Sequence, residues 1–287
     1  MTDDPFVEHR SLLFTVAYEM LGSAVDAEDV VQETWLRWVD VDQGTVDFPR
    51  AYLVQVVTRQ ALNRLRSVSR RREDYVGEWL PEPLLTDPDA AEDVELAESV
   101  SIAMLTVLET LGPSERAVFV LREVFDTPYD EIAEVVDKSP AAVRQIAHRA
   151  REHVAARRPR MDVDRAEQLA VVETFLAALS TGDLQGLMDV LAPDVVAIAD
   201  GGGLVPAARK PLIGAEKLVR LLAGAAAAPG FVASVTWLNG MPGVRLDFGE
   251  VAAAVSLVVE NGRITHVYAV NNPEKLGRLE RVAELQR

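Results

Sequence analysis

Hydrophobic positions recur at helical spacing through the first half of the chain, most clearly in residues 127–158. Pro128 predicts the start of a short helix, and Ser139 followed by Pro140 predicts the N-cap and first turn of a second one. The apolar residues of this second helix alternate spacings of four and three, the period of a helix packed on a core. They are Val143, Ala147, Ala150 and Val154. The pattern therefore predicts two short helices around a tight turn.

The opposite face of this second helix carries basic and amide side chains, namely Arg144, Gln145, His148 and Arg151. Arginine and glutamine can form paired hydrogen bonds with base edges, so a helix of this kind after a tight turn suits the major groove of DNA. An ordinary helical hairpin with a solvated charged face is the alternative interpretation.

Two earlier helices are predicted by the same periodicity, over residues 6–22 and 23–38. The inner stripe of the second is predicted to be Ala27, Val30, Val31, Thr34 and Trp38. Its other face holds Asp29, Gln32, Glu33 and Trp35. An acidic helix that carries an aromatic side chain is typical of a surface for a partner protein. Burial of Trp35 in the core is the alternative.

A long helix is predicted over residues 50–72, after the chain break at Asp47, Phe48 and Pro49. Its apolar face consists of Leu53, Val57, Ala61, Leu62 and Leu65. The other face holds Arg59, Gln60, Asn63 and Arg64, side chains that can bind unpaired bases and the phosphate backbone. A solvated helix face is the competing interpretation.

Length and charge narrow the class of protein. With 287 residues, the chain is long enough for two or three domains. Its net charge of −16 argues against a nucleic-acid binder, but positive charge clusters at residues 64–72 and 138–160, on either side of an acidic stretch. The chain has no cysteine, no apolar signal core and no run near the roughly 20 apolar residues that span a bilayer. These features predict a cytoplasmic protein, and no cofactor or metal is expected.

The second half changes character after an acidic, proline-containing linker at residues 73–94. In this linker the segment WLPEPL is too apolar for a plain spacer and should dock on another surface. Helices are predicted over residues 94–111, 114–123, 165–180, 184–191 and 214–223. Strands are predicted over 195–199, 232–238, 244–248, 251–260 and 264–270, with Asn239-Gly240 and Asn261-Gly262 as turns. Helices followed by a curled antiparallel sheet predict an α+β cone.

Three stretches of the helical half resemble the two helical domains of bacterial extracytoplasmic-function (ECF) sigma factors: DAEDVVQETWLRW, FPRAYLVQVVTRQALNRLR and LGPSERAVFVLREVFDTPYDEIAEVVDKSPAAVRQIAHRARE. The resemblance implies a region 2 domain and a region 4 helix-turn-helix domain that bind core RNA polymerase at the beta-prime clamp and the beta flap. It implies that the polymerase-binding residues are Asp29, Gln32, Glu33 and Trp35.

The same resemblance assigns promoter DNA to two helices. The melted −10 element would be read by Arg59, Gln60, Asn63, Arg64 and Arg66 with the loop that precedes them. The −35 element would be read as duplex by Ala141, Arg144, Gln145, His148, Arg149 and Arg151. Many relatives carry an asparagine where this sequence has Arg59, which leaves the base preference of the melted element open.

The C-terminal part resembles SnoaL-like members of the nuclear-transport-factor-2 (NTF2) superfamily, and three motifs resemble those of ECF group 41. They supply the expected regulatory residues between domains: Trp79, Leu80, Pro81 and Pro83; Asp200, Gly201, Gly202 and Gly203; and Asn272, Pro273, Glu274, Lys275 and Leu276. We expect this domain to act in cis by docking on the linker. Whether a small ligand occupies the cone is left open.

The sequence therefore predicts four segments. These are a region 2 domain (1–72), a linker (73–97), a region 4 domain (98–160) and an NTF2-like regulatory domain (161–287). Two other classes are weighed, a DNA-binding repressor without polymerase docking and a SnoaL-like enzyme with a helical appendage. For an enzyme, the candidate acids and bases are Asp194, Asp200, His266 and Tyr268, but no spacing singles out a catalytic pair.

Overall fold

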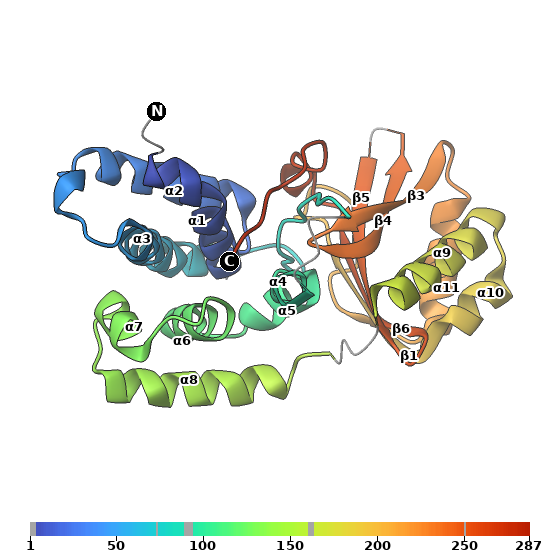
Figure 1. Cartoon of the computed structure of the whole chain (residues 1–287). Helices are drawn as coiled ribbons and strands as arrows, with labels where there is room; N and C mark the ends of the chain where they lie inside the picture. The colour runs from blue at the N-terminus through green and yellow to red at the C-terminus, as the bar shows by residue number, and fades with distance from the viewer. Residues whose placement is uncertain (1–3, 73, 89–93, 160–163, 250) are drawn as a thin grey trace. The chain divides into compact units, whose positions relative to one another are not determined.

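The chain divides into two compact units, shown in the computed structural model of Figure 1. The structure describes residues 4–72, 74–88, 94–159, 164–249 and 251–287. The helical unit comprises Met1–Asp74, Met104–Arg158 and Glu284–Arg287, and the sheet unit comprises Tyr75–Ala103 and Pro159–Ala283. Nearly all of the predicted linker thus belongs to the sheet unit.

The first part of the helical unit consists of α1 (Pro5–Leu21), α2 (Ala24–Val39) and α3 (Pro49–Arg72). The predicted inner stripes of α2 and α3 are buried. Asp4 ties the start of α1 to the end of α2, because its Oδ1 accepts hydrogen bonds from the backbone N of Phe6 at 2.9 Å and from Nε1 of Trp38 at 3.0 Å. Gly22 ends α1 in the left-handed conformation with φ of 62°.

The second part of the helical unit consists of α5 (Ile102–Leu108) from Met104 onward, α6 (Pro113–Phe119), a π-helical turn (Val120–Val124), α7 (Tyr129–Val136) and α8 (Pro140–Ala155). Arg116 on α6 joins the two parts. Its side chain is 1% exposed, donates a 3.0 Å hydrogen bond to the backbone O of Glu19 on α1 and pairs with Glu109. Burial lowers the pKa of Arg116 to about 9, so the guanidinium is still charged at neutral pH.

The prediction of one helix over residues 94–111 is wrong. The structure has two helices, α4 (Val94–Ser99) and α5, with a break at Val100 and Ser101. At the break the backbone O of Val100 accepts a 2.8 Å hydrogen bond from Nδ2 of the buried Asn239. A partner 139 residues away along the chain leaves no local signal, because no glycine or proline marks the break.

The sheet unit has the predicted α+β cone architecture. Within the described residues, its strands form one sheet in the order β2-β1-β6-β5-β4-β3. The strands are β1 (Leu191–Asp200), β2 (Leu212–Ile213), β3 (Phe231–Leu238), β4 (Met241–Phe248), β5 (Val251–Glu260) and β6 (Arg263–Val270). Strands β1 and β6 run parallel, and the other neighbouring pairs are antiparallel. β1 begins four residues before the predicted strand. Its pairing with β6 has a register shift between Leu191 and Val196.

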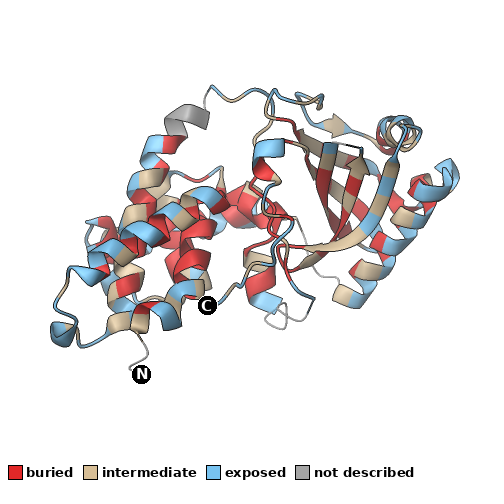
Figure 2. Ribbon diagram, turned by 90° about the horizontal axis from the view of Figure 1, so that it is seen from above, coloured by how far each residue is buried: buried red, intermediate tan, exposed pale blue. Residues whose placement is uncertain are grey.

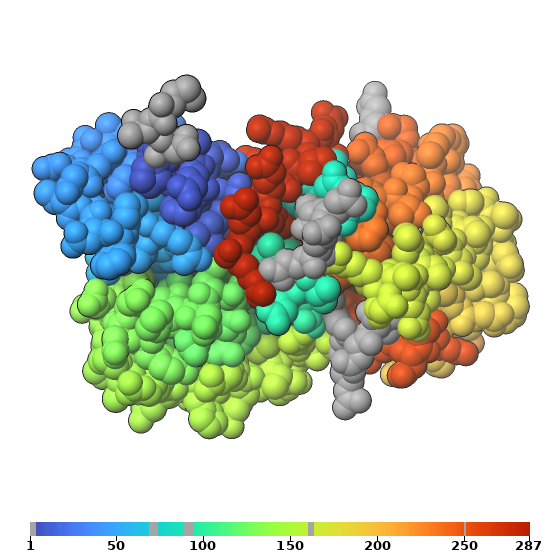
Figure 3. Space-filling model, viewed as in Figure 1, coloured from blue at the N-terminus to red at the C-terminus, as the bar shows by residue number. Residues whose placement is uncertain are grey.

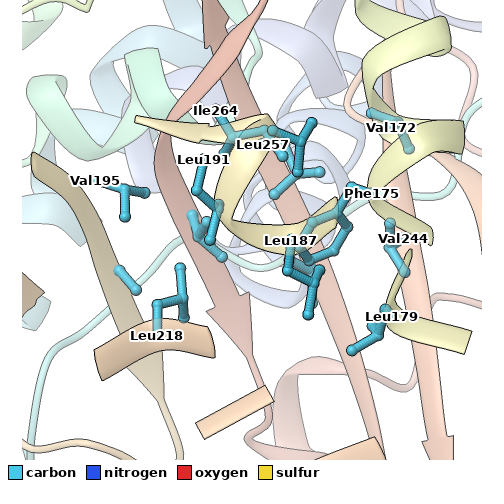
Figure 4. Packing of buried hydrophobic residues seen from close by; sticks show 14 of the residues in the cluster. Val172, Phe175, Leu179, Leu187, Leu191, Val195, Leu218, Val244, Leu257 and Ile264 are labelled. Carbon is cyan, nitrogen blue, oxygen red and sulfur yellow. The ribbon is translucent and has the colours of Figure 1, made fainter. Parts of the chain in front are cut away.

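One face of the sheet packs against α9 (Arg165–Thr181), α10 (Leu184–Val190) and α11 (Ala215–Ala226). Figure 2 shows buried residues along the strands and the helices that cover them. Between helices and sheet lies a cluster of buried apolar side chains, in which Phe175 and Leu187 point toward Val244 and Leu257 (Figure 4). The space between these helices and the sheet therefore holds the hydrophobic core of this unit.

None of the helices in the described part of the chain is long and apolar enough to cross a membrane.

Candidate functional site

The outer face of α8 is exposed along its length. Ser139 caps the helix by accepting a 3.3 Å hydrogen bond from the backbone N of Ala142, and the predicted inner stripe is buried. The exposed residues are Ala141, Arg144, Gln145, His148, Arg149 and Arg151. The helix-turn-helix geometry predicted from the sequence is therefore present, with its polar side chains directed to solvent.

Two arginines of this face are oriented by side chains of neighbouring elements. The guanidinium carbon of Arg144 lies 5.6 Å from the centre of the Tyr129 ring, and Arg151 forms a 3.1 Å ion pair with Glu123. A hydrogen bond with Tyr129 raises the pKa of Arg151, with Glu123 adding to the effect. The π-helical turn, which contains Glu123, and α7, which contains Tyr129, thus restrict the positions of these two exposed arginines.

The polar face of α3 is only partly free. Arg59, Asn63 and Arg66 are exposed and Gln60 is half-buried. Arg64 lies under α2, where it pairs with Asp26 at 2.6 Å and with Asp29 at 2.9 Å. These contacts, led by the hydrogen bond with Asp26, raise the pKa of Arg64. Arg64, a predicted DNA-binding residue, thus forms an ion pair with Asp29, a predicted polymerase-binding residue. Helical periodicity does not predict this pair.

Within the helical unit, α7 contacts the polar face of α3. Nη2 of Arg59 donates a 2.8 Å hydrogen bond to the backbone O of Glu134, and Nε2 of Gln55 donates to Oε2 of Glu134 at 3.3 Å. Next to this contact, Arg59, Asn63 and Arg66 line a hollow of about 390 Å³ together with Lys138. The side chains of the basic residues 70–72 lie outside the described part of the chain.

The outer face of α2 combines acidic, amide and apolar side chains. Asp29, Gln32 and Glu33 are exposed, and Trp35 is half-buried with its ring centre 5.0 Å from that of Phe6. Leu36 and Val39, which the sequence patterns did not single out, are 59% and 53% exposed. Exposed leucine and valine beside a tryptophan form an apolar strip on an otherwise polar helix.

In the sheet unit, the linker is held by a network centred on the Asp200 carboxylate, which is fully buried. Its Oδ1 accepts hydrogen bonds from the hydroxyl of Tyr75 at 2.7 Å and from the backbone N of Gly202 at 3.0 Å. Its Oδ2 accepts from the backbone N of Leu80 at 2.9 Å and from Nζ of Lys275 at 2.7 Å. All three predicted motifs thus meet at one carboxylate.

Lys275 and Asn272 extend this network. Lys275 is 8% exposed, donates a 2.6 Å hydrogen bond to the backbone O of Leu80 and lies over the ring of Trp79, 4.1 Å from its centre. Nδ2 of Asn272 donates to the hydroxyl of Tyr75 at 2.8 Å. Burial, followed by the hydrogen bond to Asp200, raises the pKa of Tyr75, so that its hydroxyl stays protonated and serves as a donor.

Gly202 lets the turn approach this network closely. Its φ is 60°, and a Cβ added there would lie 2.4 Å from Nδ2 of Asn272 and 3.1 Å from the Tyr75 hydroxyl. The other predicted residues of the third motif form a 3-10 turn, Pro273–Lys275, with Pro273 and Glu274 exposed and Leu276 packed on apolar neighbours that include Leu80. In the linker, Pro81 and Pro83 are buried.

Further along, the linker pairs with the turn between β3 and β4. The backbone N of Leu84 donates to Oδ1 of Asn239 at 2.9 Å, and the backbone N of Thr86 donates to the O of Trp237 at 3.0 Å. On its other side, the O of Leu85 accepts from the backbone N of Ala283 at 2.8 Å. In Figure 3 this linker segment lies between the strands and the C-terminal segment. The linker thus forms one isolated antiparallel bridge with the end of β3, between Leu85 and Leu238.

Tyr75 and Asn239 are functional candidates that the sequence patterns missed. Asn239 was recognised only as part of an Asn-Gly turn, although its fully buried side chain holds both Leu84 and Val100. Tyr75 lies in a stretch with no periodicity. The burial of Asn239 at the tip of a hairpin depends on its contacts with Leu84 and Val100, which are distant in the sequence. The Asn-Gly turn alone does not predict it.

The candidate acids and bases have different surroundings in the described part of the chain. Asp194 is exposed, and Asp200 is committed to the linker. His266 and Tyr268 stack on each other with ring centres 6.1 Å apart, and Tyr268 packs with Leu80 rather than in the apolar core of the cone. Burial lowers the pKa of His266 and raises the pKa of Tyr268 to about 12. Among described residues, no group of three His, Cys, Asp or Glu side chains could hold a metal ion.

Comparison with known proteins gives a consistent picture. The family profile described as Sigma-70 region 2 matches residues 6–71, and the profile described as Sigma-70, region 4 matches residues 101–154. The chain is 38% identical to the ECF RNA polymerase sigma factor SigJ of Mycobacterium tuberculosis, over 93% of this chain and 90% of that protein. It is 34% identical to a probable ECF RNA polymerase sigma factor, SigI, of the same organism, over 94% and 93%. The crystal structure of Mycobacterium tuberculosis SigJ matches with a TM-score of 0.75 and 35% identity, over 94% of this chain and 96% of that one.

Proposed function

Because the chain belongs to the ECF family of RNA polymerase sigma factors, we propose that its exposed helical faces bind polymerase and promoter while its sheet unit regulates them in cis. A sigma factor binds core RNA polymerase and directs initiation at specific promoters. A DNA-binding repressor without polymerase docking is not favoured, since the similarity to sigma factors extends over more than nine tenths of the chain.

The exposed face of α2 is the proposed contact with the beta-prime clamp. Asp29, Gln32 and Glu33 supply its polar part. Leu36 and Val39 supply an apolar centre, and such centres dominate the binding energy of protein interfaces. Trp35 contributes from its half-buried position against Phe6, which holds the indole in place. We assign the beta flap to the region 4 helices.

The face of α3 and its preceding loop are proposed to bind the melted −10 element. Arg59, Gln60, Asn63 and Arg66 offer hydrogen bonds and positive charge to single-stranded DNA. Phe48, in the preceding loop, is 76% exposed, and an exposed aromatic ring can stack on an unpaired base. Arg64 has a different role here: its two carboxylate partners favour a function in holding α3 against α2.

The exposed face of α8 is proposed to read the −35 element as duplex. Arg144 and Gln145 lie near its N-terminal end, where recognition helices contact base edges. His148, Arg149 and Arg151 lie further along and suit contacts to the phosphate backbone. Ala141 is a small exposed residue in the first turn, where a methyl group can contact thymine.

Control in cis is proposed from the docked linker. The linker connects the region 2 segment to the region 4 segment, so fixing it in the sheet unit restricts how far those segments can separate. The main support for control in cis is the burial of Leu80 and Leu84 in the sheet unit, where they are 0% and 1% exposed. The contact of Glu134 with Gln55 and Arg59 supports it, because part of the −10 face is engaged by the chain itself.

Three narrower points belong to the same proposal. We assign the protein to the cytoplasm, where its polymerase partner works. We assign it no catalytic activity, because Asp200 is committed to the linker and Tyr268 packs with Leu80. We also propose that a small ligand can bind to the sheet unit.

Run-off transcription with purified bacterial core polymerase tests the sigma assignment, on templates selected by the protein itself. The full-length chain should initiate specifically. Leu36→Asp should weaken core binding at least tenfold, since it places a charge in the apolar centre of the α2 face. Leu184→Asp on α10, a leucine of similar exposure at 50%, is the matched control and should bind core normally. DNA binding without initiation by the wild-type protein would instead favour a repressor.

A further inference from the structure

The turn at residues 200–203 has two sides with different surroundings. Asp200 and Gly202 face the network that holds the linker. Gly201 and Gly203 line a separate pocket of about 340 Å³. Gly201 shapes this pocket, because a Cβ there would lie 2.5 Å from the backbone O of Val205 and 2.8 Å from Cβ of Ala207. One motif therefore forms both a docking site and a cavity.

The linker forms part of the wall of this pocket. Val76 and Gly77 come from the linker, Ala199 comes from the end of β1, and the loop at residues 204–209 supplies most of the rest. The volume lies at the small end of the range of ligand sites, about 300–1,000 Å³. It is separate from the cone interior, whose apolar side chains form the buried core.

The side chains that line the pocket are apolar apart from one positive charge. Leu204 and Val76, two of its lining residues, are 57% and 48% exposed, so both leave apolar surface uncovered. Arg209 is the one ionisable side chain among the lining residues, and in the described part of the chain its guanidinium forms no ion pair. Lys210, which is also exposed, follows it directly. An unpaired guanidinium beside small apolar side chains suits an anionic group attached to a short apolar body.

We propose that this pocket binds a small organic carboxylate, with Arg209 holding the carboxylate and Val76, Leu204 and Val205 packing on the apolar body. This inference rests on the proposed function of the sheet unit and names the chemical class of its ligand. The site forms only while the linker is docked, because undocking removes Val76 and Gly77 from its wall. A ligand that binds the complete site must therefore stabilise the docked linker, by thermodynamic linkage.

Binding of benzoate to the full-length protein tests the proposal, with benzyl alcohol as the uncharged probe of the same shape. Amide chemical shifts measured by NMR should change for residues 201–209 and for Val76 and Gly77 when benzoate is added, and less with benzyl alcohol. Arg209→Gln should weaken benzoate binding at least about fivefold, the loss expected for a hydrogen-bonded charge at a partly exposed site. Arg220→Gln, at an exposed arginine of α11 that pairs with Glu216 of its own helix, should bind benzoate as the wild type does.

Hydrogen exchange reports the predicted coupling to the linker. The backbone amide of Leu80 donates to Asp200 and that of Leu84 donates to Asn239. At a benzoate concentration ten times Kd, exchange of both amides through undocking should slow about tenfold. Neither measurement requires polymerase, so this inference and the sigma assignment can fail separately.

Three outcomes would overturn the inference. The first is no binding of benzoate or of hexanoate, a flexible carboxylate. The second is equal binding by the wild type and Arg209→Gln. The third is a set of shift changes confined to the cone interior, around Phe175 and Val244. Benzoate binding that leaves the Leu80 and Leu84 amides unchanged would refute the coupling to the linker.

Discussion

The exposed polar face of α8 and the linker-docking site of the sheet unit differ in the surroundings of their polar side chains. On α8, Arg144 and Gln145 are exposed and stand on a helix whose other side is buried. In the docking site, Asp200 is fully buried and Lys275 is 8% exposed, and each is satisfied by several partners from the chain itself. The exposed polar groups on α8 are free to bind another molecule. The buried polar groups of the docking site already bind one another.

This difference has an energetic consequence. Removal of an exposed side chain should leave stability unchanged and reduce binding of DNA or polymerase. Removal of a group from the buried network should reduce the stability of the docked linker directly, because the remaining partners lose hydrogen bonds that water does not replace. The variants below test this contrast, beginning with the largest expected effect.

Asp200→Asn should have the largest effect on stability. The new amide nitrogen cannot accept a hydrogen bond, so at least one donor among Lys275, Leu80 and Tyr75 loses its partner, and the buried ammonium of Lys275 loses its counter-charge. We expect a loss of about 3–5 kcal/mol in the free energy of unfolding of the sheet unit, measured with urea. Asp194→Asn, on an exposed position of the same strand, should change it by less than about 0.5 kcal/mol. Equal effects of the two variants would contradict the network.

Gly202→Ala should lower the free energy of unfolding by a smaller amount, with two separate contributions. An alanine with φ of 60° is strained by about 1–2 kcal/mol, and its Cβ would also displace Asn272 from Tyr75, which adds about 1 kcal/mol. Gly182→Ala isolates the first contribution, because Gly182 has φ of 71° and no heavy atom within 4 Å of an added Cβ. Gly202→Ala should therefore be the more destabilising in urea unfolding. If the two losses are equal, the close approach to Asn272 has no energetic importance.

Arg144→Ala and Gln145→Ala should act on DNA binding and leave unfolding unchanged. Each should weaken binding to the cognate −35 duplex by about 1–3 kcal/mol, because a contact with a base edge is lost. Binding to random duplex should fall much less, which fluorescence anisotropy at one fixed salt concentration can measure. Equal loss on both duplexes would assign these side chains to the phosphate backbone.

The smallest expected effect is a pH dependence from His266. Burial lowers the pKa of this side chain, against the opposing influence of Glu260 and Asp194, so the folded protein favours the neutral ring. Protonation therefore opposes folding, and stability should fall as the pH drops below the ordinary value of about 6.5. His266→Gln should reduce the difference in unfolding free energy between pH 8 and pH 5. An unchanged difference would show that other groups cause the acid sensitivity.

The helical faces were predictable because their information is local. Val143, Ala147, Ala150 and Val154 repeat with the helical period, so burial of one stripe implies exposure of Arg144 and Gln145 on the other. The α+β cone was predictable for the same reason, from strand patterns separated by Asn-Gly turns. Local patterns describe a surface well when its residues belong to one element.

The docking site was predictable only as a set of motifs. The contacts of Asp200 with Leu80 and with Lys275 span 120 and 75 residues of the chain, and no local pattern encodes such a meeting. For that reason the sequence patterns do not identify Tyr75 or Asn239, and they predict continuous helix across the break between α4 and α5. The same holds for Arg64, whose pairing with Asp26 and Asp29 depends on how α2 packs on α3.

The central claim, that docking of the linker controls promoter output, is tested most directly by run-off transcription with Gly202→Ala and its control Gly182→Ala. Each is compared with the wild type at equal occupancy of core polymerase, with hydrogen exchange of the Leu80 amide as the measure of docking. We predict that Gly202→Ala speeds exchange at Leu80 and changes promoter output at least twofold, while Gly182→Ala leaves both as in the wild type. Faster exchange at Leu80 with unchanged output would contradict the claim.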